Sequence, residues 1–106
     1  MISYTEFQRL DLRTAEVLDV KPHPNADRLY VLEIKVGEER KQIVAGIRLH
    51  YQIEELVGKT VIVVHNLEPA AIRGVESNGM LLAVNDGGQV VLITPDRQVA
   101  SGAQVR

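Results

Sequence analysis

The stretch LRTAEVLDVK, residues 12–21, decides the fold class. Its apolar residues alternate as they do in a β-strand, but the alternation changes phase in the middle of the stretch. Ala15 and Val17 occupy one register, and Leu18 and Val20 occupy the other. A change of phase by one residue within a strand is what a β-bulge produces. The stretch therefore predicts one long strand with a bulge near its middle.

The stretch over residues 29–36 shows a second change of phase. The residues that set it are Leu29 and Val31, followed by Leu32, Ile34 and Val36. Two long strands that bend at their middles suit a small closed barrel, because one strand then serves both halves of the sheet. The segment between them, Pro22-His23-Pro24-Asn25-Ala26-Asp27, predicts a turn, since the residue before a proline is extended and Asn and Asp favour turns.

Shorter patterns predict the remaining elements. A capping box at Ser3 and Glu6 predicts a helix from about Tyr4 to Arg9, and Asn85-Asp86-Gly87-Gly88 predicts a hairpin turn. The other expected elements are strands at 41–47, 61–64, 81–84 and 89–93, a short helix near 53–57 stopped by Gly58, and a tail ending with Val105. Together they predict a single all-β domain over residues 1–106, with one or two short helices. The expected architecture is a five-stranded OB-fold barrel with a C-terminal strand or tail extension.

Composition limits the classes of function. The chain has 106 residues, of which 45% are apolar and none is cysteine, so one compact domain in a reducing compartment is expected. No apolar run is long enough to cross a bilayer, so we expect a cytoplasmic protein with no membrane contact. The net charge is −2, from twelve Lys or Arg and fourteen Asp or Glu, which counts against a nucleic-acid partner. The distribution of charge over the folded surface decides whether that objection holds.

Catalytic motifs are missing from the sequence. Gly58-Lys59-Thr60 resembles the end of a P-loop, but the position that requires a glycine holds Ile53. His23, His50 and His65 lie in separate predicted elements, so no metal and no cofactor is expected. We therefore expect no enzyme activity. The alternative from another class is a small enzyme with a site near His23, Asp27 and His65, which would require those groups to converge in one pocket.

The segment LEPAAIRGVESNGMLLAV, residues 67–84, holds the main binding candidates. Arg73 precedes the flexible Gly74, where a phosphate could approach closely. Ser77 and Asn78 offer short donors and acceptors for a base edge or a 2′-hydroxyl, and Met80 offers a soft apolar surface for an unstacked base. The alternative is a hairpin turn at Asn78-Gly79 with Met80 in the core.

Basic residues on the early strands form a second set of candidates. If they share one face of the barrel, they make a local basic band despite the negative total, and the alternative is that they are ordinary solvated positions. The residues expected to point outward in this band are Arg13, Arg28, Lys35, Lys41 and Arg48.

Five blocks of the sequence resemble a known family over nearly the whole chain. They are LDLRTAEVLDV, HPNADRLYVLEIKVG, IVAGIRLHYQIEELVGK, VVHNLEPAAIRGVESNGMLLA and LITPDRQVASGAQV. The chain resembles the tRNA-binding OB-fold module that is appended to bacterial methionyl-tRNA synthetases and is also found as small free-standing proteins. The resemblance implies recognition of the bent shape of tRNA, with contact through Arg73, Ser77 and Met80 and through the basic residues of the barrel face.

The same resemblance implies further partners. Free-standing relatives are homodimers joined through the N-terminal segment and the C-terminal extension, and an aminoacyl-tRNA synthetase is a possible partner. Where relatives often carry Lys or Arg, this chain has Glu68, Ala70 and Ala71, so we expect weak binding. About four phosphate contacts would give a salt slope near 3. The alternative function is an export-related chaperone of the same fold family, which would bind unfolded polypeptide on an apolar groove.

Overall fold

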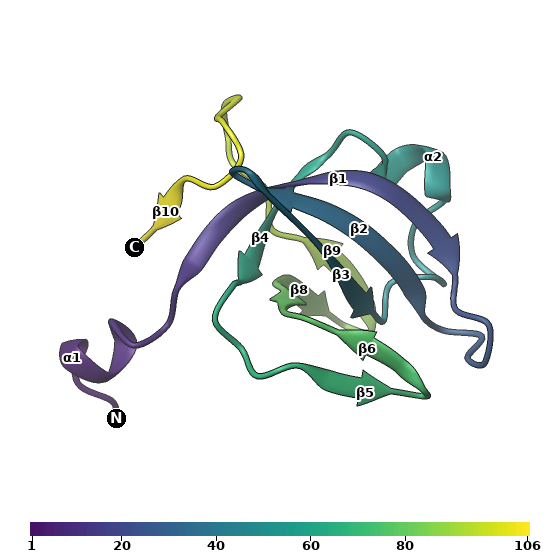
Figure 1. Cartoon of the computed structure of the whole chain (residues 1–106), viewed down its shortest axis with the longest axis horizontal. Coiled ribbons are helices and arrows are strands. Elements are labelled where there is room, and N and C mark those ends of the chain that lie inside the picture. The colour runs from purple at the N-terminus through teal and green to yellow at the C-terminus, as the bar shows by residue number, and fades with distance from the viewer.

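The computed structural model describes all 106 residues as a curled β-sheet with two short helices and several strands outside the sheet (Figure 1). The helices are α1 (Tyr4–Phe7) and α2 (Ile53–Leu56), and neither is long enough to cross a membrane. The strands are β1 (Leu12–Pro22), β2 (Tyr30–Val36), β3 (Glu39–Ala45), β4 (Thr60–Val64), β5 (Ala70–Ile72), β6 (Val75–Ser77), β7 (Met80–Leu81), β8 (Ala83–Asp86), β9 (Gln89–Leu92) and β10 (Gln104–Val105).

The long strand β1 organises the sheet. The strand order is β3-β2-β1-β4-β7, and β10 also pairs with β1. The first half of β1 pairs with β4 over Leu12 to Glu16, and the second half pairs with β2 from Glu16 to Pro22. The register with β2 shifts between Val17 and Asp19, which confirms the predicted bulge. The bulge lets one strand serve both halves of the sheet, so the predicted five-stranded OB-fold barrel with a C-terminal strand is confirmed.

The second predicted bulge, in β2, is wrong. The pairing of β2 with β3 runs without a break from Tyr30–Ala45 to Val36–Glu39. Val31 nevertheless breaks the alternation, because it and its cross-strand partner Val44 are buried on the face opposite to Leu32. The change of phase in the sequence therefore reports a strand buried on both faces rather than an extra residue.

The core lies inside the curl of the sheet. Leu32, Ile34 and Ile43 come from the first strands, and Leu56 of α2 covers one end of the barrel without any exposed surface. Val61 to Val64 lie in β4, which confirms the strand predicted there, and all four residues are buried. Burying a side chain of this size contributes about 1.5 to 3 kcal/mol, so these residues dominate the stability of the barrel.

Hydrogen bonds outside the regular ladders close the barrel between β3 and the segment after β6. The main-chain N–H of Asn78 donates to the carbonyl of Gln42 at 2.8 Å. The main-chain N–H of Val44 donates to Oγ of Ser77 at 2.9 Å. The predicted single strand over residues 81–84 is wrong, since the chain leaves the barrel at Leu82 and divides into β7 and β8.

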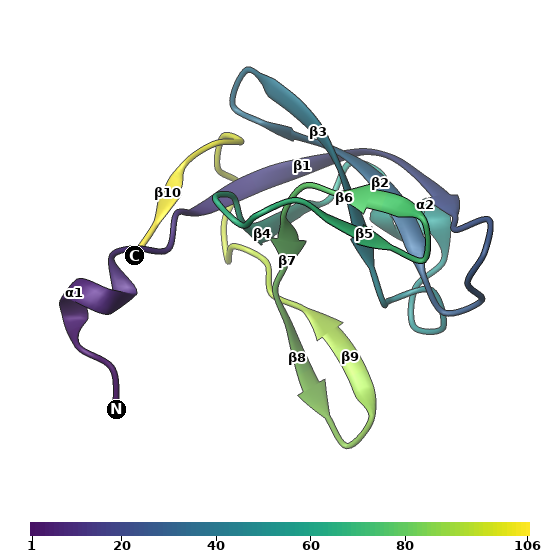
Figure 2. The ribbon, with the colours of Figure 1, turned by 60° about the horizontal axis from the view of Figure 1, so that its bottom comes forward.

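Two parts of the chain stand away from the barrel. The β8–β9 hairpin projects from it, joined by the predicted turn, in which Gly88 N–H donates to Oδ1 of Asn85 (Figure 2). Helix α1 lies beyond the start of β1, and the predicted capping box is present, although the helix ends at Phe7 rather than Arg9. Both features place exposed apolar residues outside the main core.

Candidate nucleic-acid interface

Arg73 lies at the tip of a hairpin that sequence analysis missed. The segment before residue 81, to which sequence analysis assigned no strand, forms β5 and β6, and Ile72 pairs with Val75 on either side of Arg73 and Gly74. Arg73 has a φ of 54° and Gly74 a φ of 86°, as the tight two-residue turn of a β-hairpin requires. Arg73 is the only residue other than glycine with a positive φ, and its side chain is exposed at the tip.

Three arginines gather around the loop between β1 and β2. A guanidinium N–H of Arg73 donates to the carbonyl of Asn25 at 3.4 Å, and one of Arg48 donates to the carbonyl of Ala26 at 3.1 Å. The main-chain N–H of Arg48 donates to the carbonyl of Arg28 at 3.4 Å. None of the three arginines forms an ion pair with a carboxylate. We call Arg28, Arg48 and Arg73 the arginine pole.

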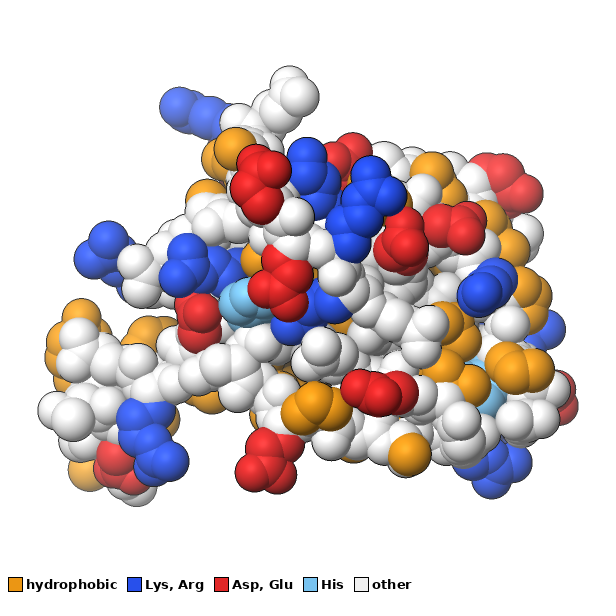
Figure 3. Space-filling view, in the orientation of Figure 1, with side chains coloured by type: hydrophobic (Ala, Val, Ile, Leu, Met, Phe, Trp, Pro, Cys, Tyr) orange, Lys and Arg blue, Asp and Glu red, His pale blue; other side chains and the backbone are white.

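Arg13 and Lys35 lie away from the arginine pole, so the expected five-residue basic band does not form. Arg13 pairs with Asp11 at 2.6 Å and also donates to the carbonyl of Gly102. Lys35 lines a cleft of about 420 Å³ whose wall also holds Glu16. Arg13 stands near the start of β1 and Arg28 beyond its end, and a strand of that length separates its ends by up to about 30 Å. Acidic and basic side chains are interspersed over the face in Figure 3.

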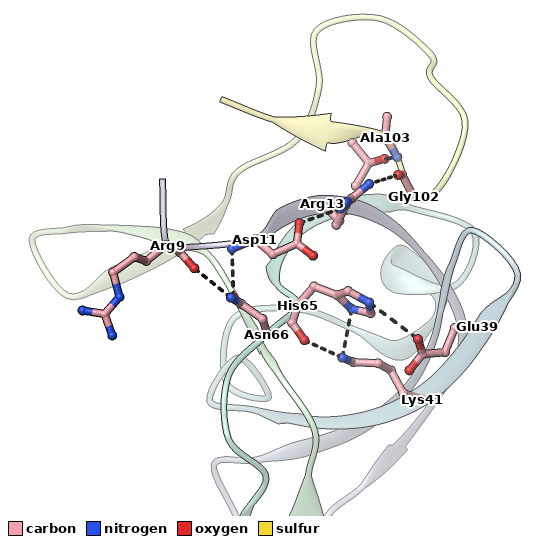
Figure 4. A network of polar contacts seen from close by, with 10 residues as sticks. Arg9, Asp11, Arg13, Glu39, Lys41, His65, Asn66, Gly102 and Ala103 are labelled. Atoms are coloured by element: carbon pink, nitrogen blue, oxygen red, sulfur yellow. Dashed lines mark hydrogen bonds and ion pairs between the residues drawn. The ribbon is translucent and has the colours of Figure 1, made fainter. Parts of the chain in front are cut away.

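The expected outward orientation of Lys41 is wrong. Residues two apart on a strand share a face, so Lys41 points inward with Ile43 and is only 8% exposed. Its Nζ donates to Nδ1 and to the main-chain carbonyl of His65, each at 3.0 Å (Figure 4). Burial lowers the pKa of Lys41, and the charges of Glu39 and Asp11 partly oppose that shift. Lys41 therefore lies at the edge of the core, where its ammonium group is hydrogen-bonded to His65.

Ser77 is buried, and its hydroxyl already has two partners. It accepts a hydrogen bond from Val44 N–H and donates to the carbonyl of Gly79 at 3.0 Å. The hydroxyl thus joins β3 to the segment after β6, and the expectation that it is free to meet a ligand needs correction. This position matters to the barrel because the Ser77 hydroxyl accepts the Val44 N–H, which a main-chain carbonyl would accept in a regular β-ladder.

Asn78 and Met80 lie at an accessible corner of the barrel. Asn78 is half-buried and lines a polar cleft of about 280 Å³ together with Gln42 and Glu76. Met80 is 46% exposed, so the alternative that placed it in the core is wrong. No hairpin forms at Asn78-Gly79, because Gly79 packs closely on the carbonyl of Val64 while the chain enters β7.

The residues of the alternative enzyme site do not converge. His23 bonds to Asn25 and to the carbonyl of Ile72, whereas His65 bonds to Lys41 and lies 3.6 Å from Glu39. The two rings therefore have separate partners at different places in the fold. Each has a structural task that accounts for its position.

Comparisons with known proteins decide the family. The family model described as "Putative tRNA binding domain" matches residues 12–104. The chain belongs to this tRNA-binding domain family. The domain is 50% identical over 105 residues to the methionine–tRNA ligase of Thermococcus kodakarensis, a match that covers 99% of this chain and 14% of that protein. The chain therefore spans only a small part of such relatives.

Two solved structures extend the likeness of the tRNA-binding domain. The MetRS related protein from Pyrococcus horikoshii has a TM-score of 0.94 and 34% identity, over 100% of this chain and 98% of that one. The chaperone CsaA from Bacillus anthracis has a TM-score of 0.89 and 31% identity, over 100% of this chain and 99% of that one. Both structures align with the whole of this chain, which includes the barrel, α1 and the β8–β9 hairpin.

Sequence analysis of this tRNA-binding domain missed the residues that hold its arginines in place. Asn25 was expected only as part of a turn, and His23 as part of that turn or of the alternative enzyme site, yet both bond to the end of the β5–β6 hairpin. Gln42 was not singled out, although its side chain donates to the carbonyl of Glu76 at 2.8 Å. The Arg73-Gly74 pair was the one local signal for the hairpin. It was missed because the first residue of such a turn has a positive φ and is usually Asn or Gly, not arginine.

Proposed function

We propose that this tRNA-binding domain binds folded tRNA without catalysing a reaction, that the arginine pole supplies the main contact, and that it acts as a homodimer. The observation that carries the proposal is the convergence of Arg28, Arg48 and Arg73 on one loop, with no carboxylate paired to any of them. Guanidinium groups bind phosphate oxygens in a bidentate manner, so three of them suit a folded RNA backbone.

Local charge explains how an acidic protein would bind a polyanion. The net charge of −2 is spread over the molecule, whereas the loop between β1 and β2 brings together three arginines that form no ion pair, against one exposed carboxylate of that loop, Asp27. Charges farther away than about 8 Å are largely screened at physiological salt, so the pole governs the local potential. About three phosphate contacts predict that log affinity falls with log salt at a slope of about 2 to 3.

The corner formed by Asn78 and Met80 would supply a second contact. The amide of Asn78 faces a polar cleft, where it can donate to and accept from a base edge. The exposed thioether of Met80 offers a polarisable surface for an unstacked base. In this proposal Ser77, Lys41 and Arg13 contribute through the fold, where each is hydrogen-bonded within the protein, and Lys35 makes no direct contact.

Apolar side chains on the projecting parts support the homodimer. Val84 and Val91 pair across the β8–β9 hairpin and are 50% and 38% exposed, on the face turned away from the buried Leu92. An isolated two-stranded hairpin is only marginally stable in water, so a second copy on this face would stabilise it. A two-fold dimer would also hold two arginine poles at a fixed separation, which a folded tRNA can match.

Titration at several salt concentrations tests the proposal. The ligands are intact tRNA and the same transcript without its tertiary fold. We expect tighter binding of folded tRNA, with affinity that falls as salt rises. Replacing Arg28 or Arg73 with Ala should each cost about 1 to 2 kcal/mol and reduce the salt slope by about 1.

Arg97→Ala is the matched control. Arg97 is an exposed arginine of the C-terminal tail, paired only with Asp96 at 3.8 Å, so its loss should leave affinity unchanged. Equal binding of folded and unfolded RNA would rule out recognition of shape. Equal effects of Arg97→Ala and Arg73→Ala would rule out the arginine pole as the contact.

A chaperone function is the second candidate. Two observations favour it: the likeness to the chaperone CsaA, and the exposed apolar side chains of the N-terminal segment around α1 and of the β8–β9 hairpin. An unfolded polypeptide added to the same titration separates the two functions. Polypeptide binding that is insensitive to salt and does not compete with tRNA would support the second candidate. We further propose the cytoplasm, where tRNA acts, and an aminoacyl-tRNA synthetase as a partner.

A further inference from the structure

His23 occupies a buried position between two surface segments. It follows Pro22, the last residue of β1, and is 3% exposed. Its Nδ1 accepts a hydrogen bond from the main-chain N–H of Asn25 at 2.9 Å. The proton of the neutral ring must then sit on Nε2, which donates to the carbonyl of Ile72 at 2.9 Å. One ring thus bonds to its own loop and to β5.

The bond to Ile72 acts at the residue before Arg73. Two more hydrogen bonds join the same segments, because Nδ2 of Asn25 donates to the carbonyl of Arg73 at 3.3 Å and Arg73 donates back to the carbonyl of Asn25 at 3.4 Å. The β5–β6 ladder contains only three residue pairs, which is too few to fix the hairpin tip by itself. The tip is therefore held by the loop between β1 and β2.

We propose that His23 is a positioning residue for the phosphate-binding arginines, a role that rests on the proposed function. Its ring fixes the hairpin tip against the loop, so that Arg73 is held at a set distance from Arg28 and Arg48. The ligand is the phosphate backbone of RNA, which requires cations at a defined spacing. Holding Arg73 in place before binding removes part of the entropy cost of ordering it on the ligand.

Backbone strain at Arg73 agrees with this role. A left-handed backbone conformation is unfavourable for residues other than glycine and persists only where the surroundings impose it. His23 and Asn25 are the side chains that bond to the carbonyls of Ile72 and Arg73. His23 is itself buried, so a change at the exposed Asn25 of the same contact is needed beside any change of His23.

Two replacements of His23 separate its two hydrogen bonds. His23→Asn keeps an acceptor near the position of Nδ1 but is too short to reach Ile72, whereas His23→Gln keeps a donor that reaches Ile72. We expect His23→Asn to weaken binding of intact tRNA about threefold to tenfold. We also expect the salt slope of tRNA binding by His23→Asn to fall by about 1, as for Arg73→Ala. The tRNA affinity of His23→Gln should stay within about twofold of that of the original protein.

A double variant identifies the route of the effect. If His23 acts by positioning Arg73, His23→Asn combined with Arg73→Ala should bind no more weakly than Arg73→Ala alone. If His23 had a purely structural role, His23→Asn would lower the free energy of unfolding. The fraction of the variant that is folded would then bind tRNA with an unchanged salt slope. An unchanged slope in His23→Asn, with a reduced slope in Arg73→Ala, overturns the role of His23 and leaves the proposed function intact. Absence of salt-dependent tRNA binding by the original protein overturns the proposed function itself.

Asn25→Ala keeps the proposal testable if His23→Asn does not fold. Asn25 is exposed, and the change removes only the side-chain bond to the carbonyl of Arg73. We expect faster amide hydrogen exchange at the hairpin tip and a smaller loss of tRNA affinity in the same direction. Unchanged exchange and unchanged affinity would show that the loop does not position Arg73, and would overturn the inference.

Discussion

Arg73 combines an unfavourable backbone with an exposed charge. A left-handed conformation costs a non-glycine residue about 1 to 2 kcal/mol, and asparagine tolerates it better than arginine does. The one side-chain hydrogen bond of Arg73 is long, 3.4 Å to the carbonyl of Asn25, so its loss should cost the hairpin little. An arginine kept at such a site is consistent with a binding task that outweighs a loss of stability.

Replacing Arg73 with Asn should therefore separate stability from binding. We expect the free energy of unfolding to rise by about 0.5 to 1 kcal/mol because the turn is relieved of strain. Affinity for tRNA should fall by about 1 to 2 kcal/mol because the guanidinium is lost. Urea unfolding measures the first effect and tRNA titration the second. A variant that is destabilised and binds as well as the original would contradict both expectations.

Lys41 gives the stability of the barrel a dependence on pH. Its pKa is lowered by burial, so between that value and the ordinary 10.5 the unfolded chain binds more protons than the folded protein. The free energy of unfolding therefore rises with pH through this window, and the unfavourable burial of charge is fully present below it.

Comparison with Lys41→Met tests this dependence by urea unfolding over a series of pH values. The original protein should gain stability relative to the variant as pH rises towards 10.5. Lys21→Met, which removes a cation from an exposed position, is the matched control. Parallel pH curves for the original protein and Lys41→Met would mean that Lys41 does not carry the effect.

The C-terminal tail is fixed to the barrel by a close contact between two glycines. A Cβ on Gly102 would lie 2.6 Å from the nitrogen of Gly37 and 2.7 Å from its Cα. The hydroxyl of Thr14 donates to the carbonyl of Ala100 at 2.8 Å and accepts from Ala103 N–H at 2.9 Å. The β10 strand therefore depends on this crossing as well as on its short pairing with β1.

Gly102→Ala should detach the tail. The clash with Gly37 adds to the cost of a positive φ, so we expect a loss of about 2 to 4 kcal/mol in the free energy of unfolding. Gly87→Ala is the control, because Gly87 has a φ of 60° but no neighbour within 4 Å. The control should lose only about 1 kcal/mol. Equal losses in the two variants would show that the close approach contributes nothing.

The projecting parts support the proposed homodimer. The N-terminal segment with α1 and the β8–β9 hairpin extend from the barrel (Figure 2), and each exposes apolar side chains that the core does not cover. They are Ile2, Tyr4 and Leu10 in the first and Val84 and Val91 in the second. The arginine pole contains only three cations, which is few for firm binding of a folded RNA. Association of two copies would cover the apolar side chains and double the pole.

Val91→Lys tests the dimer, with Gln89→Lys as the control on the same strand. A lysine at Val91 would place a charge in the proposed interface, so we expect a monomer by sedimentation. Its tRNA affinity should be at least about tenfold weaker, because the two poles no longer act together. Gln89 is exposed beside the turn, and its replacement should preserve the dimer. A dimeric Val91→Lys variant would remove the β8–β9 face as the interface.

The sequence by itself determined the barrel, the bulge in β1, the capped N-terminal helix and the turn of the β8–β9 hairpin. These features follow from the spacing of apolar residues and from turn-forming residues. Both can be recognised within short stretches of the sequence. Only the tertiary structure decided that Lys41 points inward, that Ser77 closes the barrel, and that Arg13 lies apart from Arg28. These depend on which face of each strand meets the core and on which loops meet in space. The bonds of Lys41 to His65 and of Ser77 to Val44 join residues far apart in the chain, so no local pattern encodes them. The alternation of Lys41 with Ile43 was present in the sequence, but the burial of that face became certain only in the folded sheet.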